Sequence, residues 1–306
     1  MSEMIRAIGC DWGTSSLRIY RLGDDGVVVD RREASCGIMA IEGDGFEAVF
    51  EEIIGDWLDA GLNAPVVLSG MIGSRQGWRE APYLECPADV GELVAAMLPV
   101  DLSRGRRVWV APGLSHLGEG GVPDVMRGEE VQILGALESL GDTAALVCLP
   151  GTHSKWARVE SGRVIEFSTY ITGEIFEALR DHTILGRMMT ADSWDDGAFL
   201  DGVDRSRMMG GLLNHLFGVR ARGLFGELDQ RSAGAYMSGL LVGHELASAL
   251  SENSTAEIGL IGSGRLVEHY RAALFRAGRT CKVLAPDIVA AGHWRLAQEL
   301  TQRGYC

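Results

Sequence analysis

Apolar runs and tight turns alternate at the start of the chain in an order that recurs near its middle. Residues 5–11 form an apolar run that predicts a strand, a Gly-Thr turn follows, and residues 16–22 and 26–32 predict two more strands. From residue 146 the chain repeats this order of strand, Gly-Thr turn, strand, turn and strand. We therefore predict one structural unit that is present twice.

Helical spacing of apolar residues alternates with short strands in the rest of the chain. It predicts helices over residues 45–60, 90–98, 127–140, 265–277 and 290–303. Short buried strands are predicted over residues 65–68, 107–111 and 258–261. We predict a mostly helical insert over residues 173–250, with Thr172 as the N-cap of its first helix.

Three segments lack both periodicities and are predicted to be loops. Residues 69–73 follow a buried strand and are rich in glycine, and residues 74–87 are rich in polar and aromatic side chains. Residues 113–121 form a further glycine-rich segment. Because loops held by a rigid scaffold often carry binding residues, the first two are candidates for a binding site.

The chain length and the repeat both predict two domains. A chain of 306 residues is long enough for two cores of ordinary size. We place the boundary near Gly141-Asp142, which gives domains over residues 1–141 and 142–306. The Ala-, Gly- and Leu-rich helix predicted over residues 233–250 can serve equally as a core element or as the interface of a homodimer.

Composition narrows the class of protein. The chain is 46% hydrophobic and 23% charged, and its net charge of −14 disfavours a nucleic-acid or anionic-membrane partner. No apolar stretch approaches the length of a membrane span. Because the first predicted strand leaves no room for a signal peptide, we expect a cytoplasmic protein.

The chain has six cysteines, at positions 10, 36, 86, 148, 281 and 306, and their spacing does not match that of metal ligands. We expect these cysteines to be reduced.

The two Gly-Thr turns suggest a clamp for the phosphates of ATP. Glycine allows close backbone approach, and exposed N–H groups and small hydroxyls suit phosphate oxygens. The candidate contacts in the two turns are Gly13, Thr14, Ser15 and Ser16, and Gly151, Thr152, His153, Ser154 and Lys155. One Gly-Thr pair is weak evidence for a phosphate site, whereas two copies, one in each predicted domain, are strong evidence.

Asp11 is the candidate ligand of a magnesium ion (Mg2+). It ends the first strand immediately before the turn, where its carboxylate could hold a hydrated ion against the phosphates. The alternative is a carboxylate that only accepts backbone hydrogen bonds from the turn. The equivalent residue of the second copy is Leu149, which favours a metal in one half only.

The irregular segments supply a candidate pocket for a small acidic, hydroxylated substrate. Arginine can bind both oxygens of a carboxylate, although each arginine here could instead pair with a neighbouring acid such as Glu80. The proposed substrate-binding residues are Ser69, Gly70, Met71, Ile72, Gly73, Arg75, Trp78, Arg79 and Arg127.

Two further elements complete the candidate site. Glu129 and Glu130 begin a helix, and an ionised carboxylate there could accept the proton of an attacking hydroxyl or could simply be a helix N-terminal charge. A late glycine turn, Gly262-Ser263-Gly264, could admit the adenosine of ATP. This turn lacks the full glycine fingerprint of a Rossmann dinucleotide site.

Four motifs resemble the 2-dehydro-3-deoxygalactonokinase family. They are Asp-Trp-Gly-Thr-Ser-Ser-Leu-Arg at residues 11–18, Leu-Ser-Gly-Met-Ile-Gly-Ser-Arg-Gln-Gly-Trp at 68–78, Val-Met-Arg-Gly-Glu-Glu at 125–130, and Leu-Pro-Gly-Thr-His-Ser-Lys-Trp at 149–156. The paired hairpins and the late glycine turn are similar to those of the superfamily of acetate and sugar kinases, heat-shock ATPases and actin. Residues 187–226 match little in the family.

The resemblance implies a fold, a reaction and a base. The fold is α/β, with two duplicated ribonuclease-H-like domains (the actin-like ATPase fold) and the active site in the cleft between them. The reaction is transfer of the ATP γ-phosphate to the 6-hydroxyl of 2-dehydro-3-deoxy-D-galactonate in galactonate catabolism. By analogy with related carbohydrate kinases, Glu129 is the first choice for the base and Glu130 the second.

Two alternatives to this function stay open. One is a kinase of the same superfamily that acts on another sugar or sugar acid. The other is a non-enzymatic, actin-like nucleotide switch that binds a protein partner.

Overall fold

The chain folds into two compact units. The computed structural model describes residues 4–61, 63–118, 120–141, 144–190, 193–250 and 256–305. Unit 1 comprises Met1–Ala144, Arg158–Phe167 and Ala285–Cys306, and unit 2 comprises Ala145–Ala157 and Ser168–Leu284. Asp142, at the predicted boundary, and Cys306 lie outside the described residues. The last helix and residues 158–167 therefore group with unit 1, whereas the sequence pattern assigns both to the second domain.

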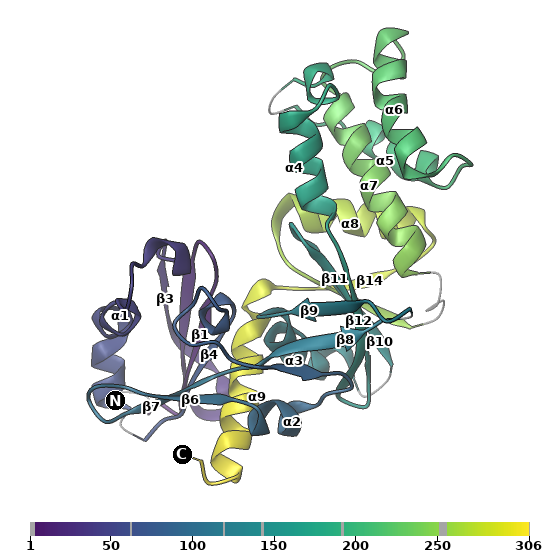
Figure 1. Ribbon diagram of the computed structural model, residues 1–306. Coiled ribbons are helices and arrows are strands. Elements are labelled where there is room, and N and C mark those ends of the chain that lie inside the picture. Colours follow the sequence, from purple (N-terminus) through teal and green to yellow (C-terminus); the bar gives the residue numbers. More distant parts are fainter. Residues whose placement is uncertain are drawn as a thin grey trace. The chain divides into compact units, whose positions relative to one another are not determined.

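Unit 1 is built on a six-stranded sheet in the order β3-β2-β1-β4-β7-β6 (Figure 1). The central strand β1 pairs antiparallel with β2, placing Asp11 opposite Arg18, and parallel with β4, placing Asp11 opposite Ser69. The strands are β1 (Ala7–Trp12), β2 (Leu17–Leu22), β3 (Val28–Ala34), β4 (Val66–Ser69), β6 (Leu98–Asp101) and β7 (Arg107–Val110). The ends of β1 and β4 thus bring two candidate site residues side by side.

The described helices of unit 1 are α1 (Phe46–Ala60), α2 (Val90–Ala95), α3 (Glu129–Leu140) and α9 (Val289–Gln302). Glycine permits the close crossing of α3 and α9, because a Cβ on Gly135 would lie 2.0 Å from the Ile288 carbonyl oxygen and one on Gly292 would lie 1.9 Å from that of Val131. This long-range packing explains why the last helix joins unit 1 although local patterns give no sign of it.

A small three-stranded sheet in unit 1 corrects two loop predictions. It contains β5 (Tyr83–Glu85), β8 (Gly113–Leu117) and β9 (Pro123–Met126) in the order β5-β8-β9. Residues 74–87 and 113–121 are therefore not loops throughout. These strands are short and partly exposed, so they lack the apolar alternation by which a strand is predicted.

A five-stranded sheet contains the second copy of the strand pattern. The sheet order is β12-β11-β10-β13-β14, which matches β3-β2-β1-β4-β7 of unit 1 strand for strand. Its strands are β10 (Ala145–Leu149), β11 (Ser154–Glu160), β12 (Arg163–Tyr170), β13 (Glu257–Ile261) and β14 (Cys281–Leu284). The repeated strand order confirms the prediction of a duplicated unit, and it agrees with the expected two-domain actin-like ATPase fold.

The helices of unit 2 are α4 (Thr172–His182), α5 (Asp196–Ser206), α6 (Gly211–Leu224), α7 (Ala233–Ala249) and α8 (Gly264–Arg276), and α4 to α7 form the predicted helical insert (Figure 1). The long α7 is a core element, since its Tyr236 and Leu240 are buried and a Cβ on its Gly239 would lie 1.9 Å from the Phe199 carbonyl oxygen of α5. Thr172 is not the N-cap of α4, because Ile171 occupies that position and the Thr172 hydroxyl donates to Glu245 instead.

Short 3₁₀ turns connect several of these helices and strands. Single 3₁₀ turns lie at Asp24–Gly26, Ile38–Ala40, Met71–Gly73, Gly186–Met188 and Pro286–Ile288. Within the described residues, no helix combines the length and the apolar character that crossing a membrane requires.

Candidate functional site

The first Gly-Thr turn is a braced loop with exposed hydroxyls. The Gly13 N–H donates to the Ser16 carbonyl oxygen at 2.9 Å, and the Ile38 N–H donates to that of Gly13 at 3.0 Å. Gly37 packs beneath the turn, where a Cβ would lie 2.1 Å from the Thr14 carbonyl oxygen. The side chains of Thr14, Ser15 and Ser16 remain exposed. The turn therefore has a fixed backbone and presents small polar groups to solvent.

Asp11 lies at the inner end of this turn with one cationic partner. Its side chain is buried, and its Oδ2 accepts a hydrogen bond from Nη2 of Arg18 at 2.5 Å. Burial raises the pKa of Asp11, and the charge and hydrogen bond of Arg18 act in the opposite direction. The guanidinium therefore stabilises the ionised carboxylate. The sequence analysis gave Arg18 no role, although the β1–β2 register determines this pairing.

The segment after β4 brings a second group of candidates against Asp11. Gly70 has φ +87°, and a Cβ there would lie 2.9 Å from the Trp12 carbonyl oxygen and 3.2 Å from Oδ1 of Asp11. Ser69 is buried, and its Oγ lies 2.9 Å from Nε2 of His293 on α9. Met71, Ile72 and Gly73 form a 3₁₀ turn, in which Ile72 is buried in the core.

His293 is a site neighbour that the sequence analysis missed. It is completely buried, and a Cβ on Gly9 would lie 2.5 Å from its Nδ1. Burial, with a contribution from Arg18, lowers the pKa of His293 to about 3, so the ring is neutral and supports Ser69. A single histidine in a helix gives no local signal of such a contact.

Three of the candidate substrate contacts have other partners in unit 1. The Trp78 ring is buried and stacks on Phe46 with ring centroids 6.4 Å apart. Arg75 lies 3.5 Å from Glu80 in an exposed ion pair, and Arg79 donates to the carbonyl oxygen of Trp78 at 2.9 Å. These contacts match the structural alternative for the arginines and give Trp78 a place in the core.

Arg127 is held inside unit 1 with part of its guanidinium unpaired. Its Nη2 donates to the Ala81 carbonyl oxygen at 2.8 Å, and its guanidinium carbon lies 4.3 Å from the centre of the Tyr83 ring. Its Nε and Nη1 are buried and have no hydrogen-bond partner among the described residues. Nη1 would lie 2.9 Å from a Cβ on Gly73, which places Arg127 beside the segment that follows β4.

Glu129 and Glu130 occupy different environments at the start of α3. A Cβ on Gly128 would lie 3.1 Å from the Cα of Gly70, so the helix begins beside the segment that contacts Asp11. Glu129 is half-buried, and its Oε2 accepts from the Arg127 N–H at 3.0 Å. Glu130 is completely buried, and its Oε2 accepts from the Gly128 N–H at 2.6 Å.

The buried Glu130 predicts a specific dependence of stability on pH. Burial, with the charge of Glu129, raises the pKa of Glu130 from 4.5 to about 8. Between these two values the folded protein binds a proton that the unfolded chain releases, so this group lowers the free energy of unfolding as pH rises. We expect wild type to lose about 3 kcal/mol between pH 5 and pH 8 relative to Glu130→Gln. Denaturant unfolding of both proteins at several pH values measures this difference, and parallel curves would contradict it.

The second Gly-Thr turn resembles the first in position and differs in its side chains. Thr152 and His153 are exposed, and the ring of His153 lies 2.5 Å from the carboxylate of Glu174. Ser154 and Lys155 are buried, with their polar atoms bonded to Tyr270 at 2.8 Å and Thr169 at 2.7 Å. The polar atoms of Ser154 and Lys155 are thus engaged inside unit 2.

The late glycine turn forms the start of α8. Gly262 has φ +152° and Gly264 has φ +71°, values that favour glycine. Ser263 is the N-cap residue, is exposed, and makes no side-chain cap hydrogen bond. The turn therefore keeps its hydroxyl and the first backbone N–H groups of α8 at the surface.

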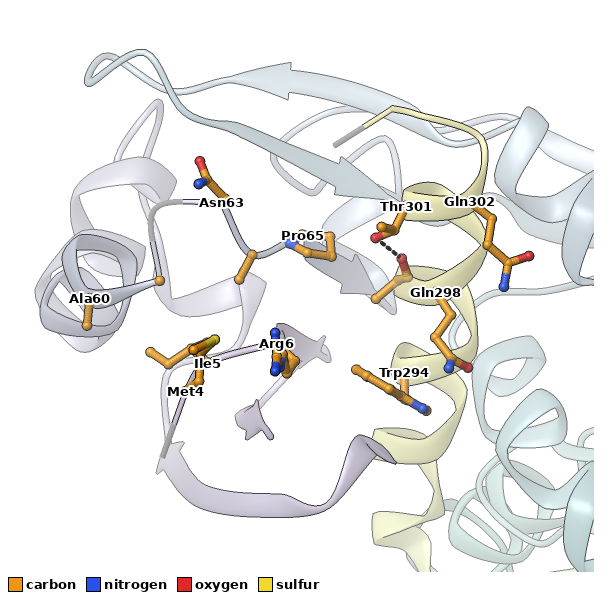
Figure 2. A pocket seen from close by; sticks show the side chains of 13 residues that line it. Met4, Ile5, Arg6, Ala60, Asn63, Pro65, Trp294, Gln298, Thr301 and Gln302 are labelled. Carbon is orange, nitrogen blue, oxygen red and sulfur yellow. Dashed lines mark hydrogen bonds between the residues drawn. The ribbon is translucent and has the colours of Figure 1, made fainter. Parts of the chain in front are cut away.

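A cavity of about 710 Å3 lies elsewhere in unit 1. Figure 2 shows Arg6, just before β1, Pro65, just before β4, and Trp294 of α9 around it. Asp11 and Ser69 are at the other end of the same two strands. This cavity is therefore separate from the candidate site.

Comparison with known proteins decides the family. The sequence profile of the 2-keto-3-deoxy-galactonokinase family matches residues 11–296. The chain belongs to this family.

Two relatives agree with this assignment. The chain is 41% identical over 290 residues to a protein of Rhizobium meliloti named as a 2-dehydro-3-deoxygalactonokinase, with 92% of this chain and 93% of the relative covered. It is 33% identical over 288 residues to the 2-dehydro-3-deoxygalactonokinase of Escherichia coli, with 92% and 94% covered. The protein is therefore a kinase.

Solved structures agree with the 2-keto-3-deoxy-galactonokinase assignment. A crystal structure from Sinorhizobium meliloti, described as a 2-dehydro-3-deoxygalactonokinase protein, has a TM-score of 0.88 at 38% identity and covers 96% of this chain and 99% of its own. Component A of the (R)-2-hydroxyglutaryl-CoA dehydratase of Acidaminococcus fermentans has a TM-score of 0.51 at 11% identity, with 96% and 98% covered. This second likeness concerns the fold alone.

Proposed function

We propose that this kinase transfers the γ-phosphoryl group of ATP to the 6-hydroxyl of 2-dehydro-3-deoxy-D-galactonate. One observation carries the proposal. In unit 1 the end of β1, the segment after β4 and the start of α3 meet, which places Asp11, Gly70 and Gly128 next to one another. Three of the four family motifs lie in these segments, which contain an acidic residue for a metal, a carboxylate for a base and an arginine for an anion.

Asp11 fits a magnesium ion that is held mainly by phosphates and water. Mg2+ usually binds proteins through one or two carboxylates and keeps several waters, so a single carboxylate is sufficient. No group of three His, Cys, Asp or Glu residues that could hold a metal alone occurs in the described part of the chain. When bound, the ion would neutralise charge on the transferring phosphoryl group.

Glu129 is the better candidate for the base. An acceptor of the substrate proton must be ionised and reachable from the pocket. Glu130 is completely buried and protonated at neutral pH, because burial raises its pKa to about 8. Glu129 is partly exposed, and the start of its helix lies beside Gly70. We therefore propose that Glu129 accepts the proton of the 6-hydroxyl.

Arg127 and the segment after β4 are the proposed contacts of the sugar acid. A buried N–H without a partner costs free energy, and a carboxylate oxygen that accepts from Nε or from Nη1 of Arg127 would offset part of that cost. Ser69, Gly70, Met71 and Gly73 provide the adjoining backbone and hydroxyl groups. Arg75, Trp78 and Arg79 have other partners here, so the support for their contact with substrate is weaker.

We propose that each of the two turns binds phosphate groups of ATP. The exposed residues of the turns, Thr14, Ser15, Ser16, Thr152 and His153, are the direct contacts. Gly262, Ser263 and Gly264 would approach the adenosine. Ser154 and Lys155 are engaged inside unit 2, which favours a supporting role for them.

We also propose that the protein is cytoplasmic and has no nucleic-acid partner. A homodimer is a further proposal that a measurement of mass in solution can test. Cys10, Cys36, Cys86, Cys148 and Cys281 are free thiols, as expected in a reducing compartment.

Coupled ADP release over a panel of sugar acids and neutral hexoses tests the substrate. We expect the highest kcat/KM with 2-dehydro-3-deoxy-D-galactonate, and a loss of about 10- to 100-fold with an uncharged analogue, since a carboxylate contact to arginine would be lost. A preference for neutral hexoses would contradict the role of Arg127 and support another sugar kinase.

A further inference from the structure

A buried carboxylate in unit 2 collects hydrogen bonds from three different elements. Glu245 lies on α7 with 3% of its surface exposed. Its Oε1 accepts from Nε1 of Trp156 on β11 at 2.7 Å, and its Oε2 accepts from the Tyr270 hydroxyl on α8 at 2.8 Å. Oε2 also accepts from the Thr172 hydroxyl at the start of α4. A buried polar group bonded in this way fixes the mutual positions of its partners.

Two branches of this cluster reach the second Gly-Thr turn. In the first, the Tyr270 hydroxyl lies 2.8 Å from Oγ of Ser154, the residue that follows His153 and begins β11. Because the Tyr270 proton is donated to Glu245, Ser154 donates to Tyr270. This chain of hydrogen bonds holds the outgoing end of the turn against α7.

The second branch runs through the first turn of α4. The Glu174 N–H donates to the Thr152 carbonyl oxygen at 3.1 Å. A Cβ on Gly173 would lie 2.6 Å from the Gly151 carbonyl oxygen, so α4 begins directly against the turn. Thr172, one residue earlier, is bonded to Glu245. Glu245 therefore braces the turn from both of its sides.

We propose that Glu245 is a positioning residue for nucleotide binding, acting through Tyr270 on Ser154 and through Thr172 on the start of α4. This inference rests on the proposed role of the second turn as a phosphate site. Glu245 itself does not touch the nucleotide. Its effect is to hold the Gly151 to His153 backbone in the geometry in which its N–H groups meet phosphate oxygens.

Paired substitutions at one position separate positioning from mere packing. Glu245→Met keeps the length of the side chain and removes every hydrogen bond. Glu245→Gln can restore them, because its carbonyl can accept from Trp156 while its amide donates to the hydroxyls of Thr172 and Tyr270, which can also accept. The Gln variant is therefore the conservative rescue of the Met variant.

The direct measurement is the Kd of the ATP analogue AMP-PNP with Mg2+, without sugar acid. We expect Glu245→Met to weaken binding about tenfold and Glu245→Gln to stay within about threefold of wild type. In steady-state assays the Met variant raises the KM for ATP and leaves the KM for the sugar acid unchanged. A folded Met variant with the wild-type Kd would overturn the proposal, because a purely structural residue changes stability alone.

Tyr270→Phe keeps the proposal testable if the Met variant does not fold. It removes the one hydroxyl that bonds both Glu245 and Ser154, and we expect a roughly threefold weaker Kd. Tyr170→Phe is its matched control, since that hydroxyl bonds Ser248 at 3.0 Å, away from the turn. Equal affinity of Tyr270→Phe and Tyr170→Phe would overturn the proposal.

The binding assay also separates this inference from the proposed substrate. Wild type that binds AMP-PNP but does not phosphorylate the sugar acid would refute the substrate and leave the test of Glu245 intact. Wild type that does not bind AMP-PNP would refute the phosphate role of the turn and the positioning role together.

Discussion

Asp11→Asn is expected to lower kcat about 100- to 1,000-fold, the usual cost of removing a group that stabilises charge in the transition state. Asparagine keeps the size of the side chain at the end of β1 and removes the negative charge that would hold Mg2+. The half-saturating concentration of Mg2+ should rise at the same time. Initial rates of ADP release over a range of Mg2+ concentrations measure both effects.

Arg18→Met is the control for this experiment. Arg18 forms the ion pair with Oδ2 of Asp11 at 2.5 Å, and its removal leaves the carboxyl group of Asp11 in place as a metal ligand. We expect a much smaller loss of kcat and little change in the requirement for Mg2+. Near-normal activity of Asp11→Asn would remove the metal role, and equal losses in the two variants would assign importance to the ion pair instead.

Glu129→Gln is the second substitution for which we expect a large fall in kcat. General bases typically contribute about 100- to 10,000-fold to the rate, and glutamine cannot accept the proton of the attacking hydroxyl. We therefore expect kcat to fall within that range while the KM for the sugar acid changes little. Single-turnover rates of phosphoryl transfer, measured with saturating ATP and sugar acid, report the chemical step directly.

Glu130→Gln tests the assignment of the base. Because Glu130 is protonated at neutral pH, glutamine closely imitates it, and kcat at pH 7 should stay near that of wild type. A large loss in Glu130→Gln with normal turnover in Glu129→Gln would reverse the assignment. Weaker binding of sugar acid without loss of turnover in Glu129→Gln would instead show that this residue is a substrate contact.

The duplicated strand pattern was predictable because local residue patterns determine its strands and turns. Each copy consists of an apolar run, a Gly-Thr turn and two further strands, and each copy builds a sheet with the same strand order. The position of Asp11 at the end of β1 follows from the same reasoning. Its counterpart Leu149 is the last residue of β10, whereas Asp11 is the last but one of β1, so the amino-acid sequence alone reveals the asymmetry of the two copies.

Side-chain directions within the candidate site were not predictable, because distant residues determine them. Ser154 was expected to contact phosphate, but its hydroxyl bonds Tyr270, which is 116 residues away in the chain. Trp78 was expected in the pocket, but Phe46 and Phe50 draw its ring into the core. His293 and Glu245 belong to α9 and α7, and only tertiary packing brings them to β4 and β11.

Helix and strand predictions were wrong where pairing with a distant strand, and not the spacing of apolar residues, determines the structure. β5 and β8 are joined by parallel pairing of Tyr83 with Gly113, residues that are far apart in the sequence. Neither strand is apolar enough to be recognised alone. The helix expected over residues 90–98 ends at Ala95, because Leu98 and the following residues pair with β7.

The central claim is that this chain couples ATP to phosphorylation of a sugar acid, and product analysis tests it most directly. ADP release should be measured with and without 2-dehydro-3-deoxy-D-galactonate, together with identification of the phosphorylated product. We predict negligible ADP without the sugar acid, and one 6-phosphorylated product for each ADP in its presence. ADP release that is independent of the sugar acid and yields no phosphorylated product would contradict the account and favour a nucleotide switch.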